Sequence, residues 1–244
     1  MVLKFITCSG ADEHTNIDDL LALAKEYPLM EIGIQVSNEK VTKNPPRFDW
    51  LMALHEKVVK QHLTPNIALH ICGEWVQQFA NREMLPEADY FMSLADGHRG
   101  FFIKRLQVDL LIGNNYLVNF GRFCQAMTDR ASRHIVLPYN DSNADFIHRL
   151  YSKDIMFDCL FNDFQNGKAL PQKYEPPVFK NRLQGYSGGF SAENVAAELQ
   201  KLSKILSSKR KIYIDAENCL KDDRGYLDLQ KCKAYIQNAL SAVK

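Results

Sequence analysis

Two side chains are of types that suit acid–base chemistry and lie beside apolar segments. Cys8 follows the apolar segment 3–7, and Asp158 lies within the apolar segment 155–160. A thiolate can act as a general base, and a carboxylic acid as a general acid, when burial and neighbours tune their pKa values. Taken singly, Cys8 is more typical of a small buried apolar residue and Asp158 of a hydrogen-bonded carboxylate. As a pair they predict proton transfer.

A third segment, Gly188-Gly189-Phe190-Ser191, suits the binding of phosphate. Two glycines let the backbone approach a ligand closely, and Ser191 can cap a helix that begins just after it. Free amides at the N-terminus of a helix bind phosphate. The alternative is a plain turn into a capped helix.

Several cysteines also lie near the ends of apolar segments, with other potential metal ligands close by. Their spacing matches no pattern of metal ligands, so we expect neither a metal nor an organic cofactor. The chain has no CxxC pair and no regular disulfide framework, which predicts reduced thiols in a cytoplasm. The residues considered as metal ligands are Cys8, Cys72, Cys159, Cys219, His70, Glu74 and Asp215.

The elements that position these residues alternate along the chain. Eight runs rich in Ile, Val, Leu, Phe and Tyr predict strands, and several are apolar on both faces, as strands covered on both sides must be. Amphipathic helical patterns lie between most of them. The predicted strands are 3–7, 31–37, 66–71, 105–112, 134–138, 155–160, 182–186 and 211–215, and the predicted helices are 18–27, 48–62, 144–151, 191–206 and 227–243.

Eight strand–helix units in 244 residues predict a fold of the α/β class, a single (β/α)8 barrel over residues 1–244. An open doubly wound sheet is the alternative, but it usually has fewer strands, and no GxGxxG follows the first strand. Prolines 171, 176 and 177 predict an irregular connection at 162–181, after the sixth strand. Within 97–129, strand and helix patterns are not cleanly separated.

Composition and charge exclude several classes of protein. Hydrophobic residues make up 46% of the chain and charged residues 24%, which excludes collagen-like and disordered classes. The net charge of +1 gives no sign of a nucleic-acid partner. No apolar run approaches the ~18 residues of a membrane-spanning helix, and the first apolar run is too short for a signal peptide. We therefore expect no membrane partner and a cytoplasmic location.

In a (β/α)8 barrel, functional side chains gather at the carboxyl ends of the strands. The segment after the seventh strand is where such barrels bind phosphate, and this favours the phosphate interpretation of Gly188 and Gly189. The same reasoning places Gln107 of the fourth strand, together with Asp215 and Glu217 of the eighth, at the predicted mouth of the barrel.

The order of these motifs resembles that of phosphoribosylanthranilate isomerase, a (β/α)8 barrel of tryptophan biosynthesis. Residues 4–10, Lys-Phe-Ile-Thr-Cys-Ser-Gly, are similar to the family's first strand, which ends in Lys-Ile-Cys-Gly. Pro45-Pro46-Arg47 is similar to its Ser-Pro-Arg, and Gln107 belongs to a looser match to its Gln-Leu-His. Residues 188–195, Gly-Gly-Phe-Ser-Ala-Glu-Asn-Val, closely resemble its Gly-Gly-Leu followed by Pro-Glu-Asn-Val.

The resemblance implies an Amadori-type isomerisation of a phosphorylated aldose derivative to a ketose, without metal or cofactor. Asp158 would be the acid that opens the sugar ring, and Cys8 the base that takes a proton from the adjacent carbon. Arg47 would hold the anionic part of the substrate, and the amides of Gly188 and Gly189 its phosphate. The implied partner is a small phosphorylated substrate, and a homodimer is compatible with the resemblance.

The chain departs from the family at two motifs. Residues 162–168 replace Gly-Gly-Thr-Gly after the sixth strand, and Ala216-Glu217-Asn218 replaces Ser-Ser-Gly after the eighth. Glu217 brings a negative charge to the expected phosphate, where repulsion at close range costs several kcal/mol. Two alternatives therefore stay open. One is an aldolase, epimerase or isomerase that uses Glu217, His70 and Asp215, and the other is a barrel that binds without catalysing.

Overall fold

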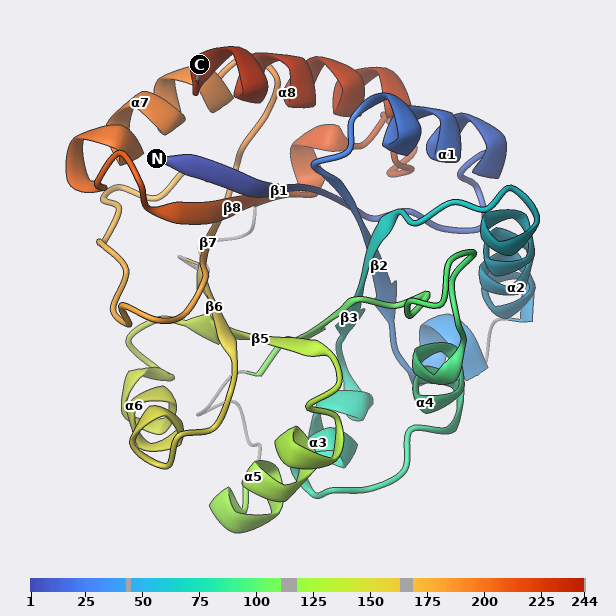
Figure 1. The fold of residues 1–244 in the computed structure, drawn as a ribbon, viewed down its shortest axis with the longest axis horizontal. Helices are drawn as coiled ribbons and strands as arrows, with labels where there is room; N and C mark the ends of the chain where they lie inside the picture. The colour runs from blue at the N-terminus through green and yellow to red at the C-terminus, as the bar shows by residue number, and fades with distance from the viewer. Residues whose placement is uncertain (43–44, 111–117, 163–168, 244) are drawn as a thin grey trace.

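The computed structural model of the protein describes residues 1–42, 45–110, 118–162 and 169–243. Eight parallel strands form a closed barrel in chain order, with β8 paired to β1 (Figure 1). The expectation of a single (β/α)8 barrel is confirmed. The strands are β1 (Val2–Ser9), β2 (Met30–Val36), β3 (Asn66–Ile71), β4 (Arg105–Val108), β5 (His134–Tyr139), β6 (Asp158–Asn162), β7 (Gln184–Ser187) and β8 (Lys211–Ala216).

Helices surround the barrel on its outside (Figure 1). Some begin where the sequence supplies a cap: Asn16 accepts hydrogen bonds from the amides of Asp18 and Asp19, and Asp228 caps the last helix in the same way. The helices are α1 (Ile17–Glu26), α2 (Pro45–Lys60), α3 (Glu74–Ala80), α4 (Pro86–Ser93), α5 (Phe120–Asp129), α6 (Ala144–Ser152), α7 (Val195–Ile205) and α8 (Leu229–Ala242), with one π-turn η1 (Asn38–Thr42) and one 3₁₀ turn η2 (Asn218–Leu220).

The barrel has two kinds of core. The main apolar core lies between the strands and the helices, and includes Ile32, Ile34 and Val36 of β2. A separate apolar cluster of Val136, Leu160 and Tyr213, with Phe5 and Leu183 packed against it, comes from strands around the inside of the barrel. Successive residues of a strand point to opposite sides, so β8 contributes Ile212 and Ile214 to the outer core and Tyr213 to the inner cluster.

The connection between β6 and β7 is irregular, as the prolines predict. Its described part, 169–183, contains no helix. It is fastened instead by two tyrosine hydroxyls: Tyr174 donates to Glu198 of α7 at 2.9 Å, and Tyr186 of β7 donates to the carbonyl of Glu175 at 2.9 Å. The long loop without a helix is visible on the left of Figure 1.

Several elements differ from the sequence-based expectations. β6 begins at Asp158 rather than at position 155, so Asp158 opens the strand. The segment between β3 and β4 holds two short helices, α3 and α4, that the apolar pattern does not separate. The predicted strand 105–112 is shorter, since β4 ends at Val108, and its last two positions lie outside the described residues. In the described part of the chain, none of the helices has the length and apolar character needed to cross a membrane.

Candidate active site at the mouth of the barrel

Asp215 of β8 lies at the centre of a polar group at the carboxyl ends of the strands. Its carboxylate accepts a hydrogen bond from the hydroxyl of Ser9 of β1 at 2.6 Å. Both residues are buried, with 7% of Asp215 and 1% of Ser9 exposed. The side chain of Ser9 points into the barrel because it lies on the same face of β1 as Phe5 and Thr7, four and two residues before it.

Gly33 of β2 is the position over which Ser9 and His70 approach each other. A Cβ atom at Gly33 would collide with the Ser9 hydroxyl oxygen and would lie 3.0 Å from Cε1 of His70. His70 belongs to β3, where it pairs in register with Gln35. The absence of a side chain at Gly33 therefore brings a hydroxyl and an imidazole together inside the barrel.

Glu217 lies just beyond β8, where it bridges two strand ends. It accepts a hydrogen bond from the Gln35 amide at 2.8 Å and forms an ion pair with Lys221 at 2.6 Å. Lys40 of η1 donates to the side-chain oxygen of Gln35. Lys221 passes over Gly10, whose φ of +105° favours glycine and where a Cβ would lie 3.1 Å from the lysine Cε. The rim of the mouth thus holds two lysines linked through Gln35 and Glu217.

Burial and neighbouring charges adjust the acid–base groups of the mouth. Burial raises the pKa of Asp215 to about 7, with a further increase from Glu217 and a decrease from its hydrogen bond with Ser9. Burial also raises the pKa of Asp109, which accepts a hydrogen bond from Gln107 at 3.2 Å. Burial lowers the pKa of His70, so its imidazole is neutral at pH 7. The mouth therefore contains a carboxyl group that exchanges protons near neutral pH.

A buried ion pair lies deeper in the barrel. Arg105 of β4 contacts Glu31 of β2 at 2.6 Å, and Thr7 donates to the same glutamate at 2.7 Å. The Arg105 guanidinium lies over the rings of Phe5 and Tyr213, with its carbon 4.9 and 4.1 Å from the ring centres. The charges of Glu31 and Arg105 both act on the pKa of Asp215, with opposite signs.

The structure corrects the expectation that Cys8 lies in the mouth. Cys8 neighbours Ser9 on β1 and points to the opposite side of the strand, towards α8. Its thiol contacts that of Cys232, and this hydrogen bond, followed by burial, raises the pKa of Cys8 well above its usual value. A thiol held protonated between β1 and α8 cannot serve as the base at the barrel mouth.

Asp158 also lies away from the mouth. It opens β6 and therefore stands at the amino end of the barrel, where its carboxylate accepts a hydrogen bond from the amide of Leu183 at 3.1 Å. It lines a shallow hollow with Arg133 and His134. Neither the expected acid nor the expected base therefore lies at the mouth. The sequence alone could not show that the strand starts three residues later than its apolar pattern.

One of the two predicted phosphate ligands, the amide of Gly189, has a partner within the protein. The amide of Gly189 donates to the carbonyl of Ala169 at 2.9 Å, and the amide of Ser191 donates to Asn194. At Gly188, whose φ is +147°, a Cβ would lie 3.0 Å from Pro171. The lack of side chains at these glycines therefore lets the β6–β7 connection pack closely against the end of β7.

Arg47 of α2 is neutralised by its own neighbours. It pairs with Glu13 and lies 3.6 Å from Asp12, and only 8% of the residue is exposed.

The structure does bring three of the predicted site residues to the inner face and mouth of the barrel, namely Gln107, Asp215 and Glu217. Sequence reasoning did not select Ser9, Lys40 and Lys221. The alternation of Ser9 with Phe5 and Thr7 along the first strand could have identified it as an inward residue. Lys40 and Lys221 lie beyond the ends of strands, where no alternation predicts the direction of a side chain.

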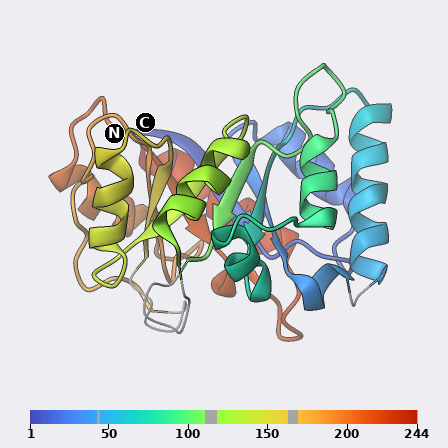
Figure 2. The ribbon, with the colours of Figure 1, turned by 90° about the horizontal axis from the view of Figure 1, so that it is seen from below.

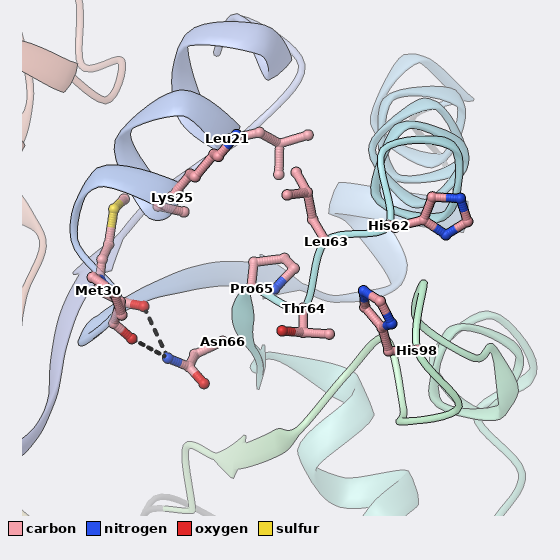
Figure 3. Close-up of a pocket in the computed structure, with 11 residues that line it drawn as sticks. Leu21, Lys25, Met30, His62, Leu63, Thr64, Pro65, Asn66 and His98 are labelled. Carbon is pink, nitrogen blue, oxygen red and sulfur yellow. Dashed lines mark hydrogen bonds between the residues drawn. The ribbon is translucent and has the colours of Figure 1, made fainter.

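No group of three or more His, Cys, Asp or Glu residues with the geometry of a metal site occurs within the described ranges. A hollow of about 350 Å³ lies at the other end of the barrel, where α1 and the end of α2 meet the loop that carries His98 (Figure 3). The rings of His62 and His98 lie 5.9 Å apart at its edge, and Asn66 donates to the carbonyls of Pro28 and Met30. This hollow contains none of the mouth residues described above.

Comparisons with known proteins support the architecture. No family model and no curated protein sequence matches the chain. Among solved structures, 3-hexulose-6-phosphate synthase from Salmonella typhimurium is similar over 99% of this chain and 100% of that one, with a TM-score of 0.51 and 10% sequence identity. At this identity the similarity concerns the fold alone, and it agrees with the closed barrel.

Proposed function

We propose that this barrel is an enzyme that moves protons on a small phosphorylated sugar derivative, in an aldose–ketose isomerisation. The observation that carries the proposal is Asp215, a buried carboxyl group at the barrel mouth with a pKa of about 7 and a hydrogen bond from Ser9. A general base works best when its pKa lies near the working pH. A carboxyl group shifted this far, at the end of a barrel that commonly holds active sites, is a strong candidate.

Asp215 takes the place that Cys8 was expected to fill. Its carboxylate would remove the proton from the carbon next to the substrate's carbonyl carbon, while the carbonyl oxygen gains a proton. Asp109, which is partly exposed and has a raised pKa, is the proposed donor of that second proton. The resulting enediol then takes a proton at the former carbonyl carbon while its other hydroxyl loses one to become the new carbonyl group. Protons lost and gained are equal, so no redox cofactor takes part.

Lys40 is the proposed partner of the phosphate. Arg47 is already balanced by Glu13 and Asp12, and Lys221 by Glu217. By contrast, the hydrogen bond of Lys40 is to the neutral amide of Gln35, which leaves its positive charge for a phosphate. A phosphate that displaced Gln35 from Lys40 would bring the substrate over Ser9 and His70.

Two resemblances support a sugar phosphate as the substrate class. The motifs around Gly188 resemble phosphoribosylanthranilate isomerase, an enzyme of an Amadori-type isomerisation. The structural neighbour is named for a hexulose phosphate. The acid–base residues implied by the isomerase resemblance are not carried over here, because Cys8 and Asp158 lie outside the mouth.

Proton exchange with solvent is the most direct test, since it does not require the product to be known. We would incubate aldose phosphates, including phosphoribosylanthranilate, in D₂O and follow deuterium at the carbon beside the carbonyl by NMR. The wild-type protein should catalyse exchange with at least one of them. Asp215→Asn should lower the rate by about 10²–10⁴-fold, the range for loss of one acid–base group.

Two control variants separate this proposal from the pairing that the sequence suggested. Cys8→Ala and Asp158→Asn should exchange deuterium at close to the wild-type rate, since neither side chain reaches the mouth. Exchange that survives in Asp215→Asn but disappears in a folded Cys8→Ala variant would overturn the assignment. Lys40→Gln should raise KM for phosphorylated substrates more than it changes kcat.

A further inference from the structure

A basic hollow lies at the amino ends of β7 and β8, at the end of the barrel opposite the mouth. Its volume is about 320 Å³, and five of the seven residues around it are lysine or arginine, although the whole chain carries a net charge of only +1. Figure 2 shows the barrel from the side, with both chain termini at this amino-terminal end. The residues around the hollow are Lys180, Asn181, Arg182, Leu183, Lys209, Arg210 and Lys211.

The two arginines give the hollow a fixed frame. Arg210 donates to the carbonyls of Phe179 at 3.0 Å, Lys180 at 2.8 Å and Arg182 at 2.7 Å, which ties the segment before β8 to the segment before β7. Arg182 is 92% buried, given its exposure of 8%, and donates to the carbonyl of Ile155 at 3.2 Å. The Nε atoms of both arginines are buried and have no hydrogen-bond partner. Both arginines therefore contribute to the hollow mainly as fixed positive charge.

The positive charge of the hollow is poorly balanced by the protein itself. Over the described residues, Lys180, Lys209 and Lys211 take part in no ion pair, and all three are exposed. The carboxylate nearest to Arg182 is that of Asp154, at 3.8 Å and fully exposed. Asp158 lies beside the hollow, and its oxygen accepts a hydrogen bond from the amide of Leu183. A ligand with several negative charges would therefore gain attraction without displacing a strong internal partner.

We propose that this hollow binds a short linear polyphosphate, such as a diphosphate or triphosphate group. Lysine ammonium groups bind phosphate oxygens, and the two arginines, which already donate to backbone carbonyls, add fixed positive charge. The hollow is at the lower end of the size range of small-molecule sites. No aromatic ring lines it, so it offers a nucleobase nothing to stack on, and the phosphate groups themselves are the recognised part. The site is independent of the mouth, because the two lie at opposite ends of the strands.

Calorimetry with sodium tripolyphosphate tests the proposal on the whole protein. Wild-type protein should bind it with a stoichiometry of one, and binding should weaken as NaCl is added, because salt screens exposed charges. The double variant Lys180→Gln/Lys209→Gln should bind about tenfold more weakly, as loss of two exposed charge contacts implies. The matched control is Lys25→Gln/Lys60→Gln, which removes the same charge from exposed lysines on α1 and α2.

The control variant distinguishes binding in the hollow from a general attraction of the anion to the positive charges of the protein. Equal weakening in both double variants, or absence of binding by the wild type, would overturn the proposal. Amide chemical shifts provide a second measurement: tripolyphosphate should move the signals of residues 180–183 and 209–211. Shifts confined to the mouth residues would assign the anion to the other end of the barrel instead. Deuterium exchange on sugar phosphates should be unchanged in Lys180→Gln/Lys209→Gln.

Discussion

The hydroxyl of Ser9 donates to the carboxylate of Asp215 at 2.6 Å, although 206 positions separate the two residues in the chain. The barrel closes through β1 and β8, where Thr7 pairs in register with Asp215. Closure therefore places the first and last strands side by side and creates the pair. The hydrogen bond stabilises the carboxylate form, while burial opposes it, and the balance raises the pKa of Asp215 to about 7.

The raised pKa of Asp215 predicts how stability depends on pH. The folded protein holds this proton more tightly than the unfolded chain, because the pKa rises from 3.8 to about 7 on folding. Stability contributed by the protonated group is full below the unfolded pKa and is lost as the pH rises towards 7. Asp215→Asn carries no such group. Between pH 4 and pH 7, its free energy of unfolding should therefore rise relative to that of the wild type by up to a few kcal/mol.

Urea unfolding at several pH values measures this difference. Asp129→Asn is the opposite control, because the hydrogen bond with Arg82 lowers the pKa of Asp129. That variant should lose stability relative to wild type above pH 4, and the difference should vanish as the pH falls. A flat difference for Asp215→Asn across the range would contradict the assigned environment.

Gly33→Ala should disturb the mouth directly. The new Cβ would collide with the Ser9 hydroxyl and crowd His70, which displaces the donor of Asp215. Overpacking at such a site costs about 1–3 kcal/mol. Proton exchange activity should fall with it. Gly121→Ala on α5, where the nearest atom would lie 3.4 Å away, is the matched glycine variant and should unfold at close to the wild-type urea concentration.

Arg105→Met should be among the most damaging substitutions. It leaves the buried Glu31 carboxylate without its cation, and breaking a buried ion pair costs about 3–5 kcal/mol. Adding Glu31→Gln should restore part of the loss, because the uncompensated charge is then removed. Thermal unfolding of the two single variants and the double variant gives the coupling energy. Additive losses would show that the two residues do not act as a pair.

Cys8→Ala should reduce stability and leave proton exchange unchanged. The thiol is fully buried against α8 beside Cys232, so its removal leaves a small cavity worth about 1 kcal/mol. Chemical unfolding and the deuterium assay on the same preparation check both parts. Cys232→Ala, on the other side of the contact, should show a similar loss of stability. A folded Cys8→Ala variant without activity would return Cys8 to the reaction.

The sequence by itself determined the barrel. Apolar runs of strand length, separated by helical patterns, recur eight times, and burial on both faces leaves few other arrangements for such strands. It also predicted the irregular β6–β7 connection, because Pro171, Pro176 and Pro177 disfavour a helix there. It also predicted that Asp215 and Glu217 lie at the carboxyl end of the barrel, because both residues come at or after the end of an apolar run.

Only the tertiary structure decided which side chains enter the mouth. Cys8 and Ser9 are neighbours on one strand, and a shift of one residue exchanges the inside for the outside. Packing of Cys8 against α8 fixes that choice, and a helix more than 200 residues away supplies the contact. The position of Asp158 along its strand also could not be predicted. The apolar run begins upstream of Asp158, but the pairing of β6 with β5 begins only at Asp158, opposite Val136. The carboxylate therefore lies at the amino end of the barrel.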